Sequence, residues 1–360
     1  MKSAARLAIA ALTLATGAPL PAQISAPLSR SAAIDALPPG DLEEAISLLR
    51  ENYLTPAALD EQELKRATLQ GLLDRLGTGA TLVAPGTTAS PVPSPLRTAV
   101  LGDTIGYLRL GALSDEHLPQ LDAALADFTR RALPSLILDL RATPAGTDYE
   151  RAAEICRRFT PKGRVLFTVR KPRAQEERLL TSRDEPKYAG LLVVLIDADS
   201  AGSAEVIAAV LRGQARAMVI GQPTRGEAVE YADLPLPSGK ILRTAVAEVV
   251  LPEGAPVFPG GLVPDLRVEV PQEKTDAVLA AGLEQPVAAL ISEKERPRMN
   301  EAALVAGVNP ELDALEAAQR EKAAKAPAPA RDLVLQRAVD FITTLRFLDA
   351  QPAAAAAKEK

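Results

Sequence analysis

Two nearly continuous aliphatic runs constrain the fold of this chain more than any other feature of its sequence. Residues 136–140 read LILDL, and residues 191–196 read LLVVLI. Runs of this kind are typical of strands buried on both faces, as in a parallel sheet. Segments with helical periodicity accompany them, at residues 117–133, 149–159 and 201–212. This alternation predicts an α/β fold in which helical crossovers join parallel strands.

The composition excludes several classes of function. Apolar residues make up 47% of the 360 residues but aromatic residues only 3%, so the core is expected to be aliphatic. The net charge is −5 and no basic stripe with interleaved aromatics is present, so we expect no nucleic-acid binding. Cys156 is the one cysteine, so no internal disulfide is possible, and because His117 is the one histidine we expect no histidine-based zinc site. Neither a metal nor an organic cofactor is expected.

The N-terminus has the pattern of an export signal. Lys2 and Arg6 precede an apolar run at residues 7–14, and small residues and proline follow to about residue 22. This order predicts a signal peptide at 1–22 and an exported protein of the bacterial envelope or periplasm. The alternative is an uncleaved anchor. No other segment approaches the length needed to cross a bilayer, so we expect no membrane span in the mature chain.

The rest of the chain divides by composition and periodicity. Paired amphipathic helices form an N-terminal arm, a Pro/Ser/Thr-rich linker follows, and the strand–helix alternation forms the core. An Ala/Leu/Glu/Lys-rich helical extension and a low-complexity end come last. The expected boundaries are 23–40 for a leader, 41–77 for the helical arm, 78–97 for the linker, 98–271 for the core, 272–348 for the helical extension and 349–360 for a disordered tail.

Four segments of the core resemble, in order, the C-terminal processing (tail-specific) serine peptidases of family S41. They are DTIGYLRL at 103–110, LILDLRATPAG at 136–146, the segment 191–231 and the segment 234–270, which contains GLVPD. The resemblance implies a ClpP/crotonase-like catalytic-core fold preceded by a helical arm and followed by a terminal helix. Such peptidases normally carry a PDZ domain between the arm and the core. Here the linker 78–97 occupies that place.

The resemblance also implies where catalytic groups should stand. The family uses a serine nucleophile, a lysine base 25 residues later and a glutamine four residues beyond the lysine. Glu205 and the flanking residues 216–224 match the family pattern without a gap. In this register the nucleophile position is Gly202, the base position is Glu227 and the glutamine position is Tyr231. Glycine has no nucleophile, and a carboxylate stands where a neutral amine is needed.

The loop that would help to form an oxyanion hole also departs from the family pattern. Its P-G-G motif reads Pro144, Ala145, Gly146, and alanine restricts the backbone if a positive φ is required. Ser203, one residue beyond the vacant position, is the fallback nucleophile. We expect it instead to be a helix-start hydrogen-bonding or surface residue, and Ser200 to cap the same helix.

Other candidate groups are weaker. A triad of Ser203, His117 and Asp139 is formally possible, but Asp139 is expected to be structural at a strand end, His117 exposed and Lys240 solvated in a turn. Cys156, on a predicted helix, is expected to be a buried core residue.

Three functions therefore remain open. The first is a catalytically inactive homologue that binds a peptide or an envelope protein, since an extended peptide can add to an exposed strand edge. The second is an active serine-type peptidase with Ser203 as a displaced nucleophile. The third is a structural oligomer scaffold, because the helical arm and extension resemble elements that mediate self-association, so a homo-oligomer is possible. We expect the first.

Overall fold

The structure is a computed structural model that describes residues 34–84, 95–114, 116–141, 143–291 and 331–356. The chain forms two compact units, Met1–Leu72 and Leu73–Lys360. The predicted signal peptide and part of the predicted leader lie outside the described residues. Within those described ranges, no helix is long and apolar enough to cross a membrane.

The predicted helical arm is present as two helices and a short turn. They are α2 (Pro39–Asn52), η1 (Pro56–Leu59) and α3 (Glu61–Leu76), the last of which extends into the second unit. The Asp60 side chain accepts a hydrogen bond from the Glu63 N–H at 2.8 Å, as an N-cap residue should. No residue of α2 or α3 is buried.

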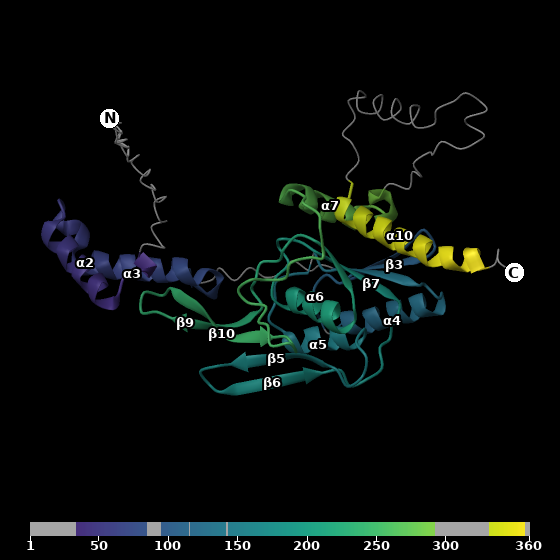
Figure 1. Cartoon of the computed structure of the whole chain (residues 1–360), viewed down its shortest axis with the longest axis horizontal. Helices are drawn as coiled ribbons and strands as arrows, with labels where there is room; N and C mark the ends of the chain where they lie inside the picture. Colours follow the sequence, from purple (N-terminus) through teal and green to yellow (C-terminus); the bar gives the residue numbers. More distant parts are fainter. Residues whose placement is uncertain (1–33, 85–94, 115, 142, 292–330, 357–360) are drawn as a thin grey trace, which may run out of the picture. The chain divides into compact units, whose positions relative to one another are not determined.

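A six-stranded sheet forms the centre of the second unit, and it confirms the predicted α/β fold (Figure 1). Its strand order is β11-β8-β7-β4-β3-β2, parallel except for β2, which pairs antiparallel with β3 at one edge. The two aliphatic runs lie side by side in the middle, with Leu136 opposite Leu192. The strands are β2 (Arg97–Leu101), β3 (Ile105–Arg109), β4 (Ser135–Asp139), β7 (Leu191–Ile196), β8 (Met218–Gly221) and β11 (Leu266–Arg267).

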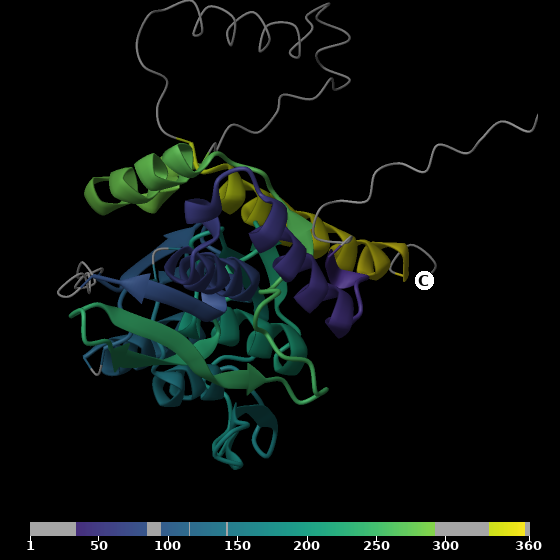
Figure 2. The same cartoon turned by 90° about the vertical axis from the view of Figure 1, so that its left-hand side faces the viewer.

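Helices cover both faces of this sheet because its residues alternate between two hydrophobic clusters. In β4, Leu136 and Leu138 face one cluster and Ile137 the other. The first face carries α4 (His117–Arg130), α5 (Tyr149–Arg157) and α6 (Ser203–Gln214). The second carries η3 (Val287–Leu290) and α10 (Leu333–Ala356), and α10 runs across the sheet in both views (Figures 1 and 2).

A second, antiparallel sheet packs on the outer side of α5 and α6 and completes the larger cluster. Its order is β1-β10-β5-β6, with β9 paired to β10. The strands are β1 (Ala80–Val83), β5 (Val165–Lys171), β6 (Glu176–Thr181), β9 (Val229–Pro235) and β10 (Ile241–Val250). Because β1 lies in residues 78–97, the segment predicted as a linker contains a strand of the core.

A buried ion-pair network attaches the last helix to the core. Arg141 lies between Asp139 and Asp332, with Nη2 at 2.7 Å from Asp139 Oδ2 and at 2.6 Å from Asp332 Oδ2. Burial opposes ionisation of Asp139, but the Arg141 charge and hydrogen bonds hold its pKa below the usual value. Asp139 also accepts a hydrogen bond from the Tyr107 hydroxyl at 2.7 Å. Asp139 is therefore structural, as expected, and Arg141 shares this role.

The extension after the core is helical where the structure describes it. It comprises α7 (Gln272–Glu284), η3 and α10, while residues 292–330 lie outside the described residues. The helix α10 continues through residues 349–356, where the sequence predicted a disordered tail.

Candidate functional site

The predicted nucleophile position lies at the junction of β7 and α6. Gly202 immediately precedes α6, with φ +57° and ψ −119°. A Cβ atom built there would lie 2.2 Å from the carbonyl oxygen of Gly146, far inside van der Waals contact. Both the positive φ and the close approach require glycine. The position therefore lacks a side chain, and its backbone leaves no space for one.

The loop that would form half of an oxyanion hole closes against this junction. Gly146 and Gly202 form a parallel β-bridge. The Gly146 carbonyl accepts hydrogen bonds from the Ser203 N–H at 2.8 Å and from the Ser203 hydroxyl at 3.0 Å. The amide next to the nucleophile position thus donates within the protein and is not available to an oxyanion.

The two serines near the junction are both buried. Ser203 is fully buried, and its hydroxyl also lies 3.3 Å from the Asp148 carbonyl oxygen. It is a hydrogen-bonding residue at the helix start, as expected, but not a surface residue. Ser200 donates to Asp197 Oδ1 at 2.8 Å and does not cap α6, because that helix begins three residues later.

The remaining catalytic candidates do not come together. The His117 ring bonds to the Ala112 carbonyl oxygen, while Asp139 is occupied by Tyr107 and Arg141. The triad of Ser203, His117 and Asp139 is therefore not assembled.

One further side chain follows its sequence-based expectation. Cys156 is buried in the hydrophobic core, and this burial raises the pKa of its thiol. In the described part of the chain, no group of three or more His, Cys, Asp or Glu residues could hold a metal ion.

One buried carboxylate joins the loops that carry the nucleophile and base positions. Glu205, on the first turn of α6, is fully buried. Its Oε2 accepts from the N–H groups of Gly202 at 2.9 Å and Glu227 at 2.7 Å. Its Oε1 accepts from the Gly226 N–H at 2.6 Å and the Thr224 hydroxyl at 2.5 Å. From the sequence this residue served only to set the register.

A cavity of about 320 Å³ is lined by the predicted nucleophile, base and glutamine positions and by two residues of the predicted oxyanion loop, but not by Ser203. Burial raises the pKa of Glu227, the Arg225 charge opposes this, and Glu205 adds to it. The Tyr231 hydroxyl donates to the Thr78 carbonyl oxygen at 2.8 Å, and burial raises the pKa of Tyr231 to about 12. The lining residues are Ala145, Gly146, Thr147, Gly202, Glu227, Tyr231, Asp233 and Arg243.

No feature of the sequence predicted the ion pair of Asp233 and Arg243 that lines this cavity. Arg243 donates to both carboxylate oxygens of Asp233, at 2.7 and 2.9 Å. These residues lie opposite each other on β9 and β10, so their meeting depends on the register of that hairpin. No lysine lines the cavity, and Glu227 has no ion-pair partner within the described ranges.

Asp197, in the turn before the junction, is a buried carboxylate with a consequence for pH-dependent stability. Burial raises its pKa to about 6, against hydrogen bonds from Ser200 that lower it. In the unfolded chain an aspartate ionises near pH ~3.9. The folded state therefore binds the extra proton between these values, and stability present below pH ~4 is lost as the pH rises through about 6.

We expect this loss to be about 2–3 kcal/mol between pH 4 and 7. The measurement is urea unfolding of the wild type and of Asp197→Asn across that range. The difference between the two should change by this amount, because asparagine cannot ionise. Asp199→Asn, at an exposed position two residues along, controls for the loss of a surface charge. A pH-independent difference would contradict the prediction.

A buried strand, a glycine turn at Gly202 and a helix start face a second loop, and serine hydrolases present their nucleophile from a strand–turn–helix arrangement of this kind. Residues 104–268 match the model of peptidase family S41, so this part of the chain resembles that family.

Similar proteins carry related names. The carboxyl-terminal-processing protease of Synechocystis is 29% identical over 182 residues, covering 51% of this chain and 42% of its own length. The carboxy-terminal-processing protease of Bartonella bacilliformis is 30% identical over 176 residues, covering 48% and 40%. The photosystem II D1 C-terminal processing protease superposes with a TM-score of 0.41 at 21% identity, covering 58% and 53%. The chain thus spans about two fifths of the length of the Synechocystis and Bartonella relatives.

Proposed function

We propose that this protein is a catalytically inactive member of the S41 family that acts by binding a polypeptide in the bacterial envelope. The observation that carries the proposal is the closure at Gly202. A carbonyl oxygen occupies the space of a nucleophile side chain, and the same oxygen takes the hydrogen bond of the adjacent amide. Acyl transfer needs both the nucleophile and that donor.

The base position supports the same proposal. A lysine base works as a neutral amine that takes a proton from the serine hydroxyl. Glu227 is a carboxylate, and the lining residues that carry a hydroxyl are Thr147 and Tyr231, neither of which is at the nucleophile position. The buried Ser203 hydroxyl donates to the backbone carbonyl oxygens of Gly146 and Asp148. The serine that could have replaced the nucleophile is therefore held in structural hydrogen bonds.

A binding role uses what the fold retains. Two sheets with free edges and a cavity bounded by the former catalytic loops remain in place. An exposed strand edge can add an extended peptide through main-chain hydrogen bonds, without catalytic residues. The predicted signal peptide, and relatives named as carboxyl-terminal-processing proteases, support a polypeptide ligand in the envelope.

The decisive experiment asks whether the purified protein has any hydrolase activity. We expect no cleavage of an unfolded polypeptide and no labelling by a fluorophosphonate probe, with the Bartonella relative as the positive control. Cleavage or labelling that disappears in Ser203→Ala would overturn the proposal in favour of a displaced nucleophile. Binding is tested separately, since a strand-forming peptide should raise the melting temperature if the protein binds polypeptides.

A further inference from the structure

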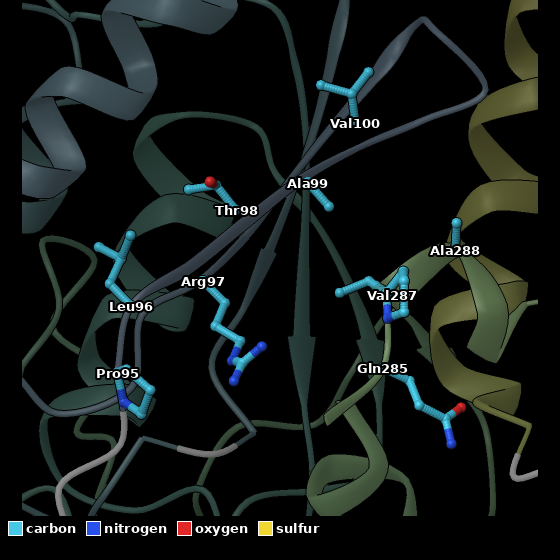
Figure 3. A pocket seen from close by; sticks show the side chains of 10 residues that line it. Pro95, Leu96, Arg97, Thr98, Ala99, Val100, Gln285, Val287 and Ala288 are labelled. Carbon is cyan, nitrogen blue, oxygen red and sulfur yellow. The ribbon is translucent and has the colours of Figure 1, made fainter. Parts of the chain in front are cut away.

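A second groove, larger than the cavity lined by Gly202 and Glu227, runs along the edge strand β2. Its volume is about 560 Å³ (Figure 3). Six consecutive residues, 95–100, form one wall, and residues 285–288, which follow α7 and include the start of η3, form the other. None of these residues lines the catalytic cavity. The groove therefore runs parallel to β2 for most of the length of the strand, as a bound extended chain would.

The edge of β2 is free to accept a further strand. β2 is the last strand of the six-stranded sheet and pairs with β3 alone. No strand in the described part of the chain pairs with its outer edge. The outer backbone N–H and C=O groups of an edge strand are ready-made partners for another extended chain.

Arg97 gives this groove a positive charge without an acidic partner. Figure 3 shows its side chain extending from β2 toward the wall that carries Gln285 and Val287. Among the described residues, its side chain forms one hydrogen bond, from Nη2 to the Leu283 carbonyl oxygen, and its Nε is buried without a partner. Among the described residues no carboxylate forms an ion pair with it, although a guanidinium is built for bidentate binding of one.

A second arginine increases the excess of positive charge. Arg109 lies directly opposite Arg97 across the β2–β3 pair and is 3% exposed. It binds the Leu279 and Gly282 carbonyl oxygens at 3.3 and 3.4 Å. Like charges placed opposite each other on neighbouring strands repel. The C-terminal end of α7 offsets only about half a charge.

The acidic residue opposite Arg109 on the neighbouring strand is already compensated. Asp139 neighbours Arg109 on β4, but it forms its hydrogen bonds with Tyr107 and Arg141. Arg97 and Arg109 therefore both bind carbonyl oxygens near the C-terminal end of α7. Among the described residues, no carboxylate pairs with Arg97 to balance the remaining positive charge at the groove.

We propose that this groove binds an acidic peptide as an added strand on β2, with a Glu or Asp side chain of the peptide accepted by Arg97. Lining residues continue on both sides of Arg97, from 95 to 100, so a bound chain passes over it. This favours an internal acidic side chain over a terminal carboxylate. The inference goes beyond the proposed function because it names a separate site and the charge of its ligand.

The test compares short Val/Thr-rich peptides, capped at both ends, that carry Glu, Gln or Lys at one central position. Affinities are measured by fluorescence anisotropy with the full chain. The Glu peptide should bind about tenfold more tightly than the Gln peptide, and the Lys peptide more weakly still. In Arg97→Gln the Glu and Gln peptides should bind equally, while Arg97→Lys should regain part of the difference.

Arg130→Gln is the matched control, because it removes an exposed arginine of α4 and should leave all affinities unchanged. Arg97→Gln also removes a like-charge pair, so it should fold. Equal binding of the three peptides by the wild type would overturn the inference while leaving polypeptide binding intact. Binding by none of them would also overturn it, as would a dimer, seen by sedimentation, that Arg97→Gln dissociates. A Gln peptide with a free C-terminus that matches the Glu peptide would assign the site to a terminal carboxylate and contradict the proposal.

Discussion

Replacing Gly202 with serine is expected to destabilise the protein by about 3–5 kcal/mol and to restore no peptidase activity. The new Cβ would lie 2.2 Å from the Gly146 carbonyl oxygen, and the backbone there has φ +57°. To make room, the loop with Gly146 must withdraw and release both hydrogen bonds from Ser203. Unfolding in urea measures the loss, and cleavage of an unfolded polypeptide measures activity.

Two variants separate the clash from other causes. Gly202→Ala should be as destabilised as Gly202→Ser, since the added Cβ and not the hydroxyl is responsible. Gly213→Ser is the matched control, because a Cβ on that glycine of α6 meets nothing within 4 Å. It should be neutral or slightly stabilising, as serine is a better helix former than glycine.

The double variant Gly202→Ser with Glu227→Lys restores both residues of the family dyad. We still expect no cleavage, because the Ser203 amide remains committed to Gly146 or, if the loop moves, the oxyanion site is disordered. Recovery of cleavage in the double variant would contradict this. It would mean that the closed loop adapts readily and that only the two side chains were lost.

The central sheet could be predicted because its signal is local. The runs at 136–140 and 191–196 are apolar enough to exclude any exposed placement, and they became β4 and β7. The intervening helices begin within about two residues of their predicted starts, as expected for strongly periodic segments.

The second sheet was mostly missed for a physical reason. Strand β5 pairs with β6 and with the distant β10, and β6 exposes most of its side chains. A sequence such as EERLLT carries no alternation that distinguishes a strand from a helix. The strand β1 is specified by pairing with β10, a partner far along the chain, so residues 80–83 read as part of a linker.

At the candidate site, residue identities were predictable and backbone closure was not. The three positions that the register marks, Gly202, Glu227 and Tyr231, line one cavity. That Gly146 bridges to Gly202 follows from the conformation of two distant loops, which no local pattern encodes. The same limit hid the pairing of Arg97 with Arg109, since the register of an edge strand is set by its turn and by packing.

Among the carboxylates of this protein, we expect Glu205 to contribute most to the stability of the fold. Glu205→Gln is expected to lower the free energy of unfolding by about 3–5 kcal/mol. Each carboxylate oxygen of Glu205 accepts two donors, and at least one of each pair is a backbone N–H. In either orientation, the glutamine NH₂ group would face a backbone donor that has no other acceptor. A buried unsatisfied donor carries its full desolvation cost.

The loss should be visible both globally and at the site. Urea unfolding gives the free energy, and hydrogen exchange should show faster exchange at the amides of Gly226 and Glu227, which donate to Glu205. Glu230→Gln is the control: its ion pairs with Lys171 and Arg178 involve exposed cations, and their loss should cost no more than about 1 kcal/mol. If Glu205→Gln were as stable as that control, the carboxylate would not be what holds the nucleophile and base loops together. The closure at Gly202 would then have to be maintained by the Gly146 contacts alone.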